Sequence, residues 1–479
     1  MTEDLKDMRR WVVYQVLTDR FAGPEGREIR GLSTTGPAYR WNQFAGGTYQ
    51  GLQSRLSYLR NLGMTALWIS PVVAQSILPA GPGKKEHHGY HGYWARDFEQ
   101  PSRELGSEEE LSRLLQACAQ HDISPILDVV LNHSNPKYSS DRGDLYRNGK
   151  LFARYQDDPD SVFHHYGNLD QTQEYEPFQW ENFDVWSLAD LAQENTQVSE
   201  YLKRAHLRWI KMGFAGVRID TALHVPASWL REWRDFIRKN APDCRFFMGE
   251  WWNGGAGHKV VPGLARQSGM HITDFEFAEA VRGWLTGLND LGPLKTCLEL
   301  QDGFEDPDLK VNFLDNHDMP RLMNGLLSQG YNLQKARRRL VIGVALLMFW
   351  RGLPCVYYGT ESALFTRRRA RGKPWGQDPY NREPMRFSPV DEELTGMIRL
   401  FSRLRRETDL TEHRLVVVEE AADVWEIGRG RFRLQLDLGP EGEPSGASLW
   451  EEEKLLWRSV KDASTKDGNE MSTMDKVTI

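Results

Sequence analysis

The segment from Val198 to Asp220 reads VSEYLKRAHLRWIKMGFAGVRID, and it contains both kinds of element from which the fold is built. Apolar residues recur at helical spacing over Val198–Lys211, which predicts a helix. Ala215–Asp220 is a short apolar run of the length typical of a buried strand. A helix that leads directly into such a strand indicates an α/β fold with a parallel sheet.

The same alternation extends along most of the chain. About eight strands are expected, and repeated β–α units in that number favour a parallel sheet closed into a (β/α)₈ TIM barrel. An open doubly wound sheet is the alternative, but no glycine-rich fingerprint follows the first predicted strand. The other predicted strands are Trp11–Val16, Thr65–Ser70, Ser124–Leu131, Arg245–Gly249, His271–Phe275, Val311–Leu314 and Pro354–Tyr357, and the other predicted helices are Gly51–Asn61, Ser107–Gln120, Ser228–Lys239, Leu333–Phe349 and Glu392–Arg406.

Two segments interrupt this alternation. His133–Asp190 is long, polar and aromatic, and because structureless loops of this size are uncommon, we expect a small domain inserted after the third strand. Beyond about residue 390, apolar and polar residues alternate around Gly428-Arg-Gly430, which predicts a small antiparallel β domain. The expected organisation is a first barrel part (1–132), the inserted domain (133–190), a second barrel part (191–390), the C-terminal β domain (391–450) and a polar, partly disordered tail (451–479).

Composition excludes several classes of protein. The chain has 479 residues, 40% of them apolar, and a formal charge of −7, which disfavours a nucleic-acid binder. No apolar stretch is long enough to span a membrane, and no signal-peptide core is present near Met1, so we expect a cytoplasmic protein that does not bind membranes. The 17 tryptophans include potential platforms for sugar rings. The four cysteines, which we expect to be reduced and mostly buried, show no disulfide framework and no metal-site spacing: Cys118, Cys244, Cys297 and Cys355.

The predicted strand Ala215–Asp220 ends in residues that are candidates for catalysis. Arg218 and Asp220 point to the same face because strand side chains alternate. In a barrel this pair would lie at the carboxyl end of a strand, where barrel active sites are built. We expect Arg218 to lower the pKa of Asp220 and keep it ionised, as a nucleophile requires. A structural ion pair is the alternative interpretation.

Acidic residues also follow other predicted strands. Glu250 comes directly after Phe246–Gly249, and its flanking aromatic residues should raise its pKa, which suits a general acid. A surface glutamate at a strand terminus is the alternative. His317 and Asp318 end another strand, and the segment Asp128–His133 ends a fourth. These groups converge only if the barrel closes.

Carboxylates, an arginine, histidines and many aromatic rings together favour glycoside cleavage. A retaining glycosidase needs a carboxylate nucleophile and a protonated carboxyl acid about 5 to 5.5 Å apart, and neighbouring strand ends can supply that spacing. A metallohydrolase is the competing class, but the sequence contains no His-x-His and no His-Glu-x-x-His motif.

These segments resemble the conserved regions of the α-amylase superfamily of glycoside hydrolases. Asp128–His133 is similar to the first region, Gly216–His224 to the second, Glu250 to the third and Phe313–Asp318 to the fourth. The resemblance runs from about residue 11 to residue 387. Other similar stretches are Tyr14-Gln15, Thr18–Phe21, Gly46-Gly47, Trp68–Pro71, Tyr90–Trp94, Gly352–Glu361 and Asn381–Met385.

The resemblance implies a role for each group. Asp220 would be the nucleophile, Glu250 the general acid and then the base, and Asp318 the group that stabilises the distorted sugar. Arg218 would orient Asp220, and Trp252 would add bulk on the leaving-group side. Tyr93 would stack on the sugar ring, and the residues that would bind its hydroxyl groups are His91, His133 and His317. The insertion would be the family's domain B and the C-terminal strands its domain C.

The resemblance also implies a calcium ion between the barrel and domain B. Its ligands would be Asn132, Asp190 and the main chain near His224, and oxygen ligands suit Ca²⁺. The stretch Leu188–Ala192 lacks the second acidic residue often found there. No organic cofactor is expected.

The implied function is retaining cleavage of α-glucosidic bonds, above all α-1,4 bonds of malto-oligosaccharides or related α-glucans. Leu223 stands where many endo-amylases have lysine, so one sugar contact on the leaving-group side is lost. This departure leaves room for the first alternative, a transglycosylase (glucanotransferase) of the same mechanism. The alternative from another class is a catalytically silent carbohydrate-binding or scaffold protein.

Overall fold

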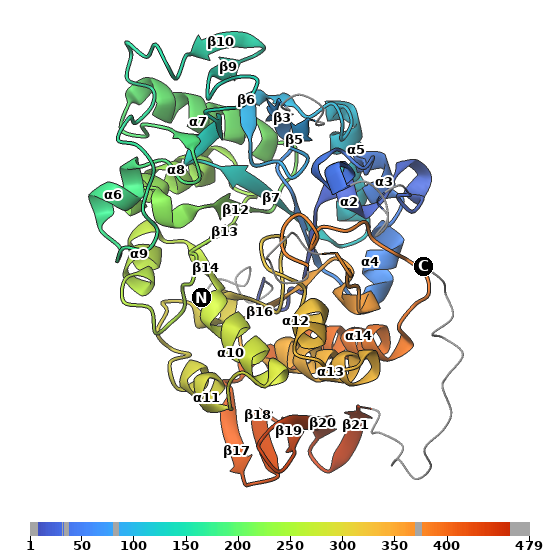
Figure 1. Cartoon of the computed structure of the whole chain (residues 1–479). Coiled ribbons are helices and arrows are strands. Elements are labelled where there is room, and N and C mark those ends of the chain that lie inside the picture. Colours follow the sequence, from blue (N-terminus) through green and yellow to red (C-terminus); the bar gives the residue numbers. More distant parts are fainter. Residues whose placement is uncertain (1–7, 31, 33–37, 80–85, 369–375, 460–479) are drawn as a thin grey trace.

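The computed structural model describes residues 8–30, 32, 38–79, 86–368 and 376–459. At its centre, eight parallel strands close into a barrel in the order β1-β16-β15-β14-β13-β12-β7-β2, which confirms the predicted barrel (Figure 1). Each strand is short and almost entirely buried, as expected for strands covered by helices outside and packed side chains inside. The strands are β1 (Val13–Val16), β2 (Ala66–Ile69), β7 (Ser124–Val130), β12 (Gly216–Asp220), β13 (Phe246–Gly249), β14 (His271–Asp274), β15 (Val311–Phe313) and β16 (Leu353–Tyr357).

Amphipathic helices lie between the barrel strands. The start of α5 shows how local sequence sets such a helix: the Ser107 hydroxyl accepts from the Glu110 amide (3.3 Å), and the Glu110 carboxylate accepts from the Ser107 amide (2.8 Å). The single helix predicted over 51–61 is wrong, because the chain turns at Ser54 and Arg55 and forms two helices. The helices are α2 (Thr18–Phe21), α3 (Tyr49–Gln53), α4 (Leu56–Leu62), α5 (Glu108–Gln120), α6 (Pro177–Asn182), α7 (Thr196–Ile210), α8 (Ala227–Asn240), α9 (Val261–Ser268), α10 (Phe275–Thr286), α11 (Gly292–Glu299), α12 (Leu322–Ser328), α13 (Leu333–Phe349) and α14 (Glu392–Glu407), with 3₁₀ turns η1 (Pro24–Gly26), η2 (Ala38–Asn42), η3 (Ala222–His224), η4 (Pro307–Leu309), η5 (Thr360–Ser362) and η6 (Leu410–Glu412).

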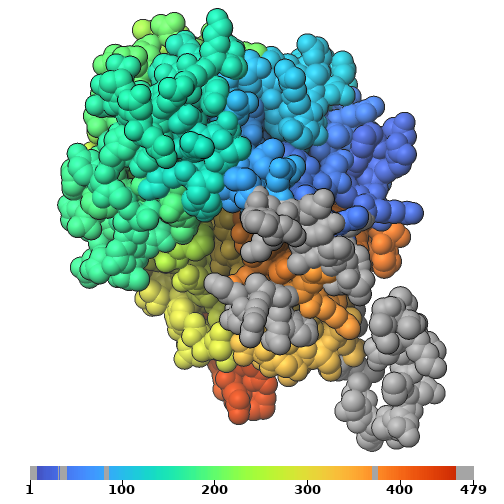
Figure 2. Space-filling model, turned by 45° about the horizontal axis from the view of Figure 1, so that its top comes forward, coloured from blue at the N-terminus to red at the C-terminus, as the bar shows by residue number. Residues whose placement is uncertain are grey.

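Small sheets lie beyond the carboxyl ends of the barrel strands, and their strands pair antiparallel except for the parallel pair β6 and β9. The segment after β7 is not self-contained, because two of its strands extend a sheet begun by strands that follow β2, in the order β10-β9-β6-β3. In Figure 2 the green atoms of this segment adjoin the blue atoms of the N-terminal third along the upper surface. The strands are β3 (Val73–Gln75), β4 (Ile77–Leu78), β5 (His87–His88), β6 (Ala95–Pro101), β8 (His133–Pro136), β9 (Leu145–Arg147), β10 (Lys150–Ala153) and β11 (Leu188–Asp190).

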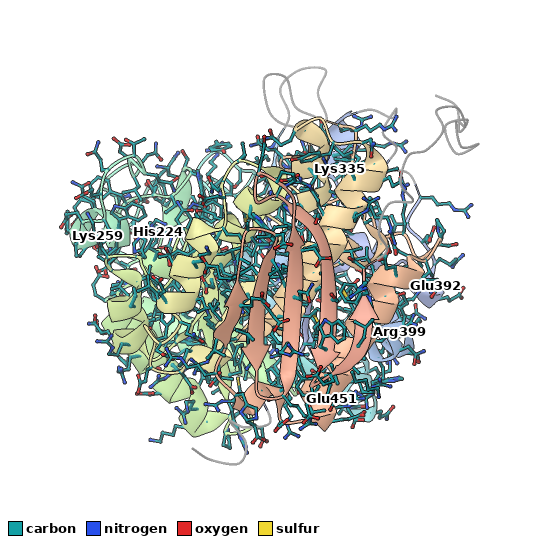
Figure 3. All side chains as sticks on the ribbon, turned by 90° about the horizontal axis from the view of Figure 1, so that it is seen from below. His224, Lys259, Lys335, Glu392, Arg399 and Glu451 are labelled. Atoms are coloured by element: carbon teal, nitrogen blue, oxygen red, sulfur yellow. The ribbon has the colours of Figure 1, made fainter. Side chains whose placement is uncertain are left out.

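A five-stranded antiparallel sheet follows α14 and lies across the lower face of the molecule (Figure 3). Its last strand occupies residues that were expected to belong to the tail. That expectation is wrong up to residue 459, because Lys454–Arg458 pairs along β20 and completes the sheet. Residues 460–479 lie outside the described residues. The strands are β17 (Val416–Glu420), β18 (Val424–Arg429), β19 (Phe432–Leu438), β20 (Pro444–Glu451) and β21 (Lys454–Arg458).

A large hydrophobic core joins the barrel to this sheet. Buried side chains of α13, such as Leu346, belong to the same cluster as Leu434 of β19 and Leu449 of β20. All four cysteines are buried free thiols, in agreement with the expectation. Among the described helices, none has the length and hydropathy needed to cross a membrane.

Candidate active site

The carboxyl ends of the barrel strands gather the predicted acidic residues. Asp220 is the last residue of β12, and Glu250 directly follows the neighbouring strand β13. Asp128 lies on β7, on the other side of β12, paired in register with Arg218. Parallel register therefore brings together acids that are up to 122 positions apart in the chain (250 − 128).

Arg218 is the centre of this acidic cluster. Its side chain is 0% exposed, and one nitrogen, Nη1, contacts Asp128 (2.7 Å) and Asp220 (2.8 Å). Its other terminal nitrogen, Nη2, forms an ion pair with Glu250 at 2.6 Å. Asp128 also accepts hydrogen bonds from the Trp68 indole and the Tyr93 hydroxyl, both at 2.8 Å. A buried charge needs such partners, because an uncompensated one is costly.

The pKa values of the two central carboxyls are both raised. Burial raises the pKa of Asp220 to about 7, although Arg218 opposes the shift. The expectation of a low pKa for Asp220 is therefore wrong for the substrate-free site, because desolvation outweighs the ion pair. Burial also raises the pKa of Glu250 to about 7, as expected for a general acid.

Backbone geometry fixes the position of Glu250 relative to Asp220. Thr221, directly after Asp220, adopts a left-handed conformation (φ 47°), which is strained for a β-branched residue. This turn directs its amide at Glu250, whose Oε2 accepts the hydrogen bond at 3.2 Å. The Glu250 amide in turn donates to the Ile219 carbonyl (2.9 Å). The Glu250 carboxyl is thus held by a main-chain as well as a side-chain contact.

Asp318 lies in a different electrostatic setting. It contacts His317 Nε2 at 2.9 Å and accepts a hydrogen bond from Arg382 at 3.0 Å. Burial acts to raise its pKa, but His317, Arg382 and Arg218 together outweigh burial and hold the pKa below its ordinary value. Asn381 donates to the His317 carbonyl (2.6 Å) and fixes this loop. Asp318 is therefore the ionised member of the three carboxyls.

Aromatic and imidazole rings line the same end of the barrel. The Tyr93 ring stacks on His317 (5.0 Å between centroids) and on His91 (5.6 Å). Burial lowers the pKa of His91 well below its ordinary value and that of His133 to about 4. His133 is 1% exposed, and its Nε2 contacts the Tyr93 carbonyl (3.1 Å), so it supports the Tyr93 loop from below.

A cleft of about 770 Å³ opens next to Glu250. Trp252, 39% exposed, lies in it and packs against Phe275 with ring centroids 5.0 Å apart. His224 stacks on Trp180 at 5.1 Å and lies on the same side of the molecule as Lys259 in Figure 3. Residues from both the barrel and the segment after β7 form its walls, among them Trp180, Trp186, Leu223, His224, Trp252 and Lys259.

The residues predicted to bind calcium present two unused oxygens. Asn132 Oδ1 and Asp190 Oδ1 are buried and have no hydrogen-bond partner. The other Asp190 oxygen contacts His164 Nδ1 at 2.6 Å. Burial raises the pKa of Asp190 to about 7. Within the described residues, no three His, Cys, Asp or Glu side chains gather into a metal site, so a cation here would depend on amide and main-chain oxygens.

Three residues of the site lie in stretches that the sequence analysis named, but the sequence alone predicted no individual role for them. Asp128 was quoted only as part of a strand end, yet it forms the second ion pair of Arg218. Arg382 lay in a family-like stretch and contacts Asp318. Gln15 lay in another family-like stretch, Tyr14-Gln15, and it contacts His317 Nδ1 at 2.7 Å.

Comparisons with known proteins agree with this geometry. The family model for the α-amylase catalytic domain matches residues 15–396. A cyclomaltodextrin glucanotransferase of Bacillus sp. (strain 38-2) is 32% identical over 385 residues, which cover 78% of this chain and 51% of the relative. The corresponding enzyme of Klebsiella oxytoca is 30% identical over 444 residues, covering 85% of this chain and 66% of the relative. The chain thus spans about half the length of the first of these relatives.

Solved structures give the same family. A cyclomaltodextrin glucanotransferase with a three-domain ABC distribution matches with a TM-score of 0.78 and 30% identity, covering 90% of this chain and 87% of that one. An α-amylase from Geobacillus thermoleovorans, complexed with acarbose, matches with a TM-score of 0.72 and 26% identity over the same shares of the two chains. The chain therefore belongs to the α-amylase family, whose catalytic domain it carries over residues 15–396.

Proposed function

We propose that this protein cleaves α-1,4-glucosidic bonds of malto-oligosaccharides or related α-glucans through a covalent glycosyl-enzyme, and that a sugar hydroxyl competes with water for that intermediate. The observation that carries the proposal is the bridge of Asp220 and Glu250 by the single guanidinium of Arg218. Two carboxyls that contact nitrogens of one guanidinium lie close together. This supports the short separation of retaining enzymes, about 5 to 5.5 Å, over the wider spacing of inverting ones.

In the first step, Asp220 attacks the anomeric carbon as a carboxylate. Glu250 donates its proton to the leaving glycosidic oxygen, and the C–O bond to that oxygen breaks. Asp318 remains ionised and accepts hydrogen bonds from ring hydroxyls of the distorted sugar. Because Arg218 contacts both reacting carboxyls, it favours the ionised form of whichever one has lost its proton.

In the second step, Glu250 is a carboxylate and takes a proton from the incoming hydroxyl group. That group belongs to water in hydrolysis and to a second sugar in transfer. The oxygen of that group bonds to the anomeric carbon while the bond from this carbon to Asp220 breaks, which releases Asp220 as a carboxylate. Trp252, Trp180 and Trp186 give the cleft beside Glu250 apolar faces on which a sugar acceptor can stack. This aromatic lining, together with the two glucanotransferase relatives, favours transfer as the second candidate activity.

Glu250→Gln should abolish cleavage of maltoheptaose, with a rate loss of about 10²- to 10⁴-fold, because the leaving oxygen is no longer protonated. Fluoride needs no proton to leave, so the first-turnover release of fluoride from α-maltosyl fluoride should persist. Product chromatography and a fluoride electrode measure the two rates. Wild-type cleavage of maltoheptaose by the variant would contradict the role of Glu250, and loss of the fluoride burst would indicate general damage to the site.

The pH profile should be bell-shaped. Above about pH 7, Glu250 loses the proton that the leaving group needs; below about pH 7, Asp220 gains a proton and stops being a nucleophile. Values of kcat/KM for maltoheptaose should therefore fall on both sides of neutrality. With α-maltosyl fluoride, the fall on the alkaline side should disappear while the fall on the acid side remains. An unchanged alkaline fall with the fluoride would contradict the assignment.

Trp252→Ala should shift the partition of the intermediate from sugar acceptors towards water. Incubation of the wild-type protein with maltotriose should yield products longer than the substrate. The ratio of transfer to hydrolysis should fall roughly three- to tenfold in the variant, the equivalent of about 0.5–1.5 kcal/mol of lost ring contact. Tyr138→Ala is the matched control, since Tyr138 is 60% exposed and lies outside the cleft. An equal fall in both variants would exclude a specific acceptor contact.

We also propose a Ca²⁺ ion held by Asn132 Oδ1, Asp190 Oδ1 and the main chain near His224. The two buried unpartnered oxygens support it. Chelation by EDTA should lower Tm, and added Ca²⁺ should restore it. At a hundredfold excess of Ca²⁺ over Kd, the bound ion should raise the free energy of unfolding by about 2.7 kcal/mol. Asp190→Asn should remove this response, and Asp170→Asn, an exposed change, should retain it. A Tm that is insensitive to EDTA, with no calcium by elemental analysis, would exclude the ion.

A further inference from the structure

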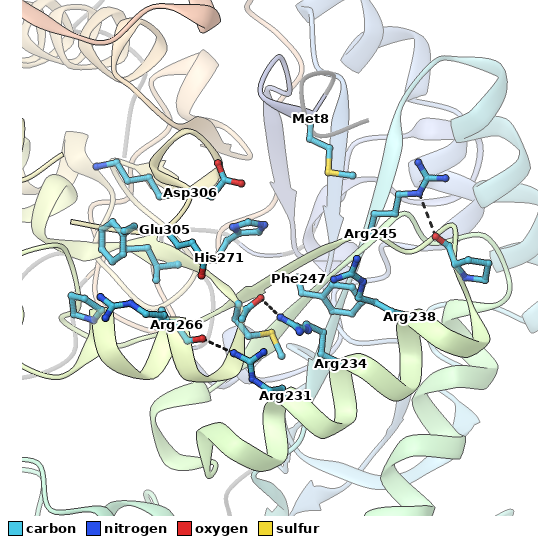
Figure 4. Close-up of a pocket in the computed structure, with 18 residues that line it drawn as sticks. Met8, Arg231, Arg234, Arg238, Arg245, Phe247, Arg266, His271, Glu305 and Asp306 are labelled. Atoms are coloured by element: carbon cyan, nitrogen blue, oxygen red, sulfur yellow. Dashed lines mark hydrogen bonds between the residues drawn. The ribbon is translucent and has the colours of Figure 1, made fainter. Parts of the chain in front are cut away.

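A second cavity, of about 630 Å³, lies at the opposite end of the barrel from the carboxyl cluster (Figure 4). Arg245 directly precedes β13, His271 is the first residue of β14, and Lys310 directly precedes β15. The amino ends of parallel barrel strands face away from the catalytic end. The remaining walls come from α8, α9 and the loop before η4. Neither step of the proposed reaction uses any residue of this cavity.

The lining of the cavity has a marked excess of positive charge. Apart from its arginines, the lining has charged side chains that are paired: Lys310 is neutralised by Asp274 at 2.6 Å, and Asp306 contacts Arg9 at 3.5 Å. Burial, with Arg234 nearby, lowers the pKa of His271 to about 4, so this ring is neutral at pH 7. Among the described residues, Glu305 and Asp306 are the only acids in the lining. The arginines that line the cavity are Arg231, Arg234, Arg238, Arg245 and Arg266.

The arginines differ in how their guanidinium groups are used. Arg231 donates to the Arg266 carbonyl (2.7 Å) and Arg234 to the Gly269 carbonyl (2.7 Å), so both cap the carboxyl end of α9. Arg245 donates to the Pro242 carbonyl (3.3 Å). Within the described part of the chain, the side chains of Arg238 and Arg266 make no hydrogen bond or ion pair. Their donor forks are available to a ligand in the cavity.

The cavity also offers apolar surface beside these charges. Met8, Phe247 and Met270 line it together with the arginines. Figure 4 shows Arg238 beside Phe247 on one side and Arg266 with Glu305 on the other. The volume lies within the range of about 300–1,000 Å³ that holds small ligands. A ligand that suits this lining carries a compact anionic group and an uncharged body.

We propose that this cavity binds a phosphate monoester with a sugar or nucleoside body, whose phosphate is held by Arg238. A guanidinium fork matches two phosphate oxygens, which a lysine ammonium cannot do. Arg234 is paired with Asp235 at 2.7 Å, so the phosphate contact falls to Arg238. The apolar wall of Met8, Phe247 and Met270 receives the body of the ester. The site is separate from the proposed catalytic site and does not depend on its activity.

The test is calorimetric titration of the full chain with α-D-glucose 1-phosphate, AMP, inorganic phosphate and glucose. At least one ester should bind more tightly than inorganic phosphate, and glucose should not bind in this cavity. Arg238→Gln should weaken ester binding roughly tenfold or more, the equivalent of one charged hydrogen bond. Lys239→Gln, which removes the same charge from the next residue of α8 outside the cavity, should bind as the wild type does. Both variants should keep the wild-type Tm, because no hydrogen bond or ion pair joins Arg238 to another described residue.

Three results would overturn the proposal. The first is that neither ester binds. The second is that Arg238→Gln binds the esters as tightly as the wild type, which would place them in the catalytic cleft. The third is that inorganic phosphate binds as tightly as the esters, which would leave no role for the apolar wall. Which of the two esters binds more tightly identifies the body as a sugar or a nucleoside.

Discussion

Arg218 places a fully buried positive charge among carboxylates from three adjacent strands, and the carboxyl end of the barrel depends on that charge. Without it, Asp128, Asp220 and Glu250 would be buried acids facing one another with no cation to compensate them, which is costly. With it, one proton shared between Asp220 and Glu250 is the favourable state near neutrality. The aromatic rings of Trp68 and Tyr93 lie over the guanidinium at 5.1 and 5.6 Å and keep water from it.

The division of roles among the carboxyls follows from their surroundings. Asp318 contacts His317 and Arg382, is partly exposed and has a lowered pKa, so it stays ionised. Asp220 and Glu250 share one guanidinium in a dry pocket and have raised pKa values. Pairs of carboxyls with separated roles are the basis of glycosidase chemistry. The strained turn at Thr221 adds a main-chain donor at Glu250, beside the contacts that Arg218 makes with Asp220 and Glu250.

The two ends of the barrel have opposite electrostatic character. The carboxyl end concentrates acids and aromatic rings around a cleft. The amino end, at β13 and β14, concentrates arginines around a cavity that suits an anion. Strand β13 joins them, with Arg245 before its first residue and Glu250 after its last. A net charge of −7 for the whole chain conceals this separation, because it averages the two ends.

The sequence by itself determined the barrel, because each strand is a compact apolar run between amphipathic helices. It also placed Asp220 and Glu250 at the ends of such runs, whereas Asp318 lies beyond the end of β15 and its role was implied only by the resemblance to the α-amylase superfamily. Tertiary structure alone decided what these acids do electrostatically. Whether Arg218 would lower the pKa of Asp220 depended on how deeply both are buried and on Asp128, which approaches from another strand. The arginine-lined cavity was likewise hidden, because its residues come from two helices and three strand ends, and only the closed barrel brings them to one place.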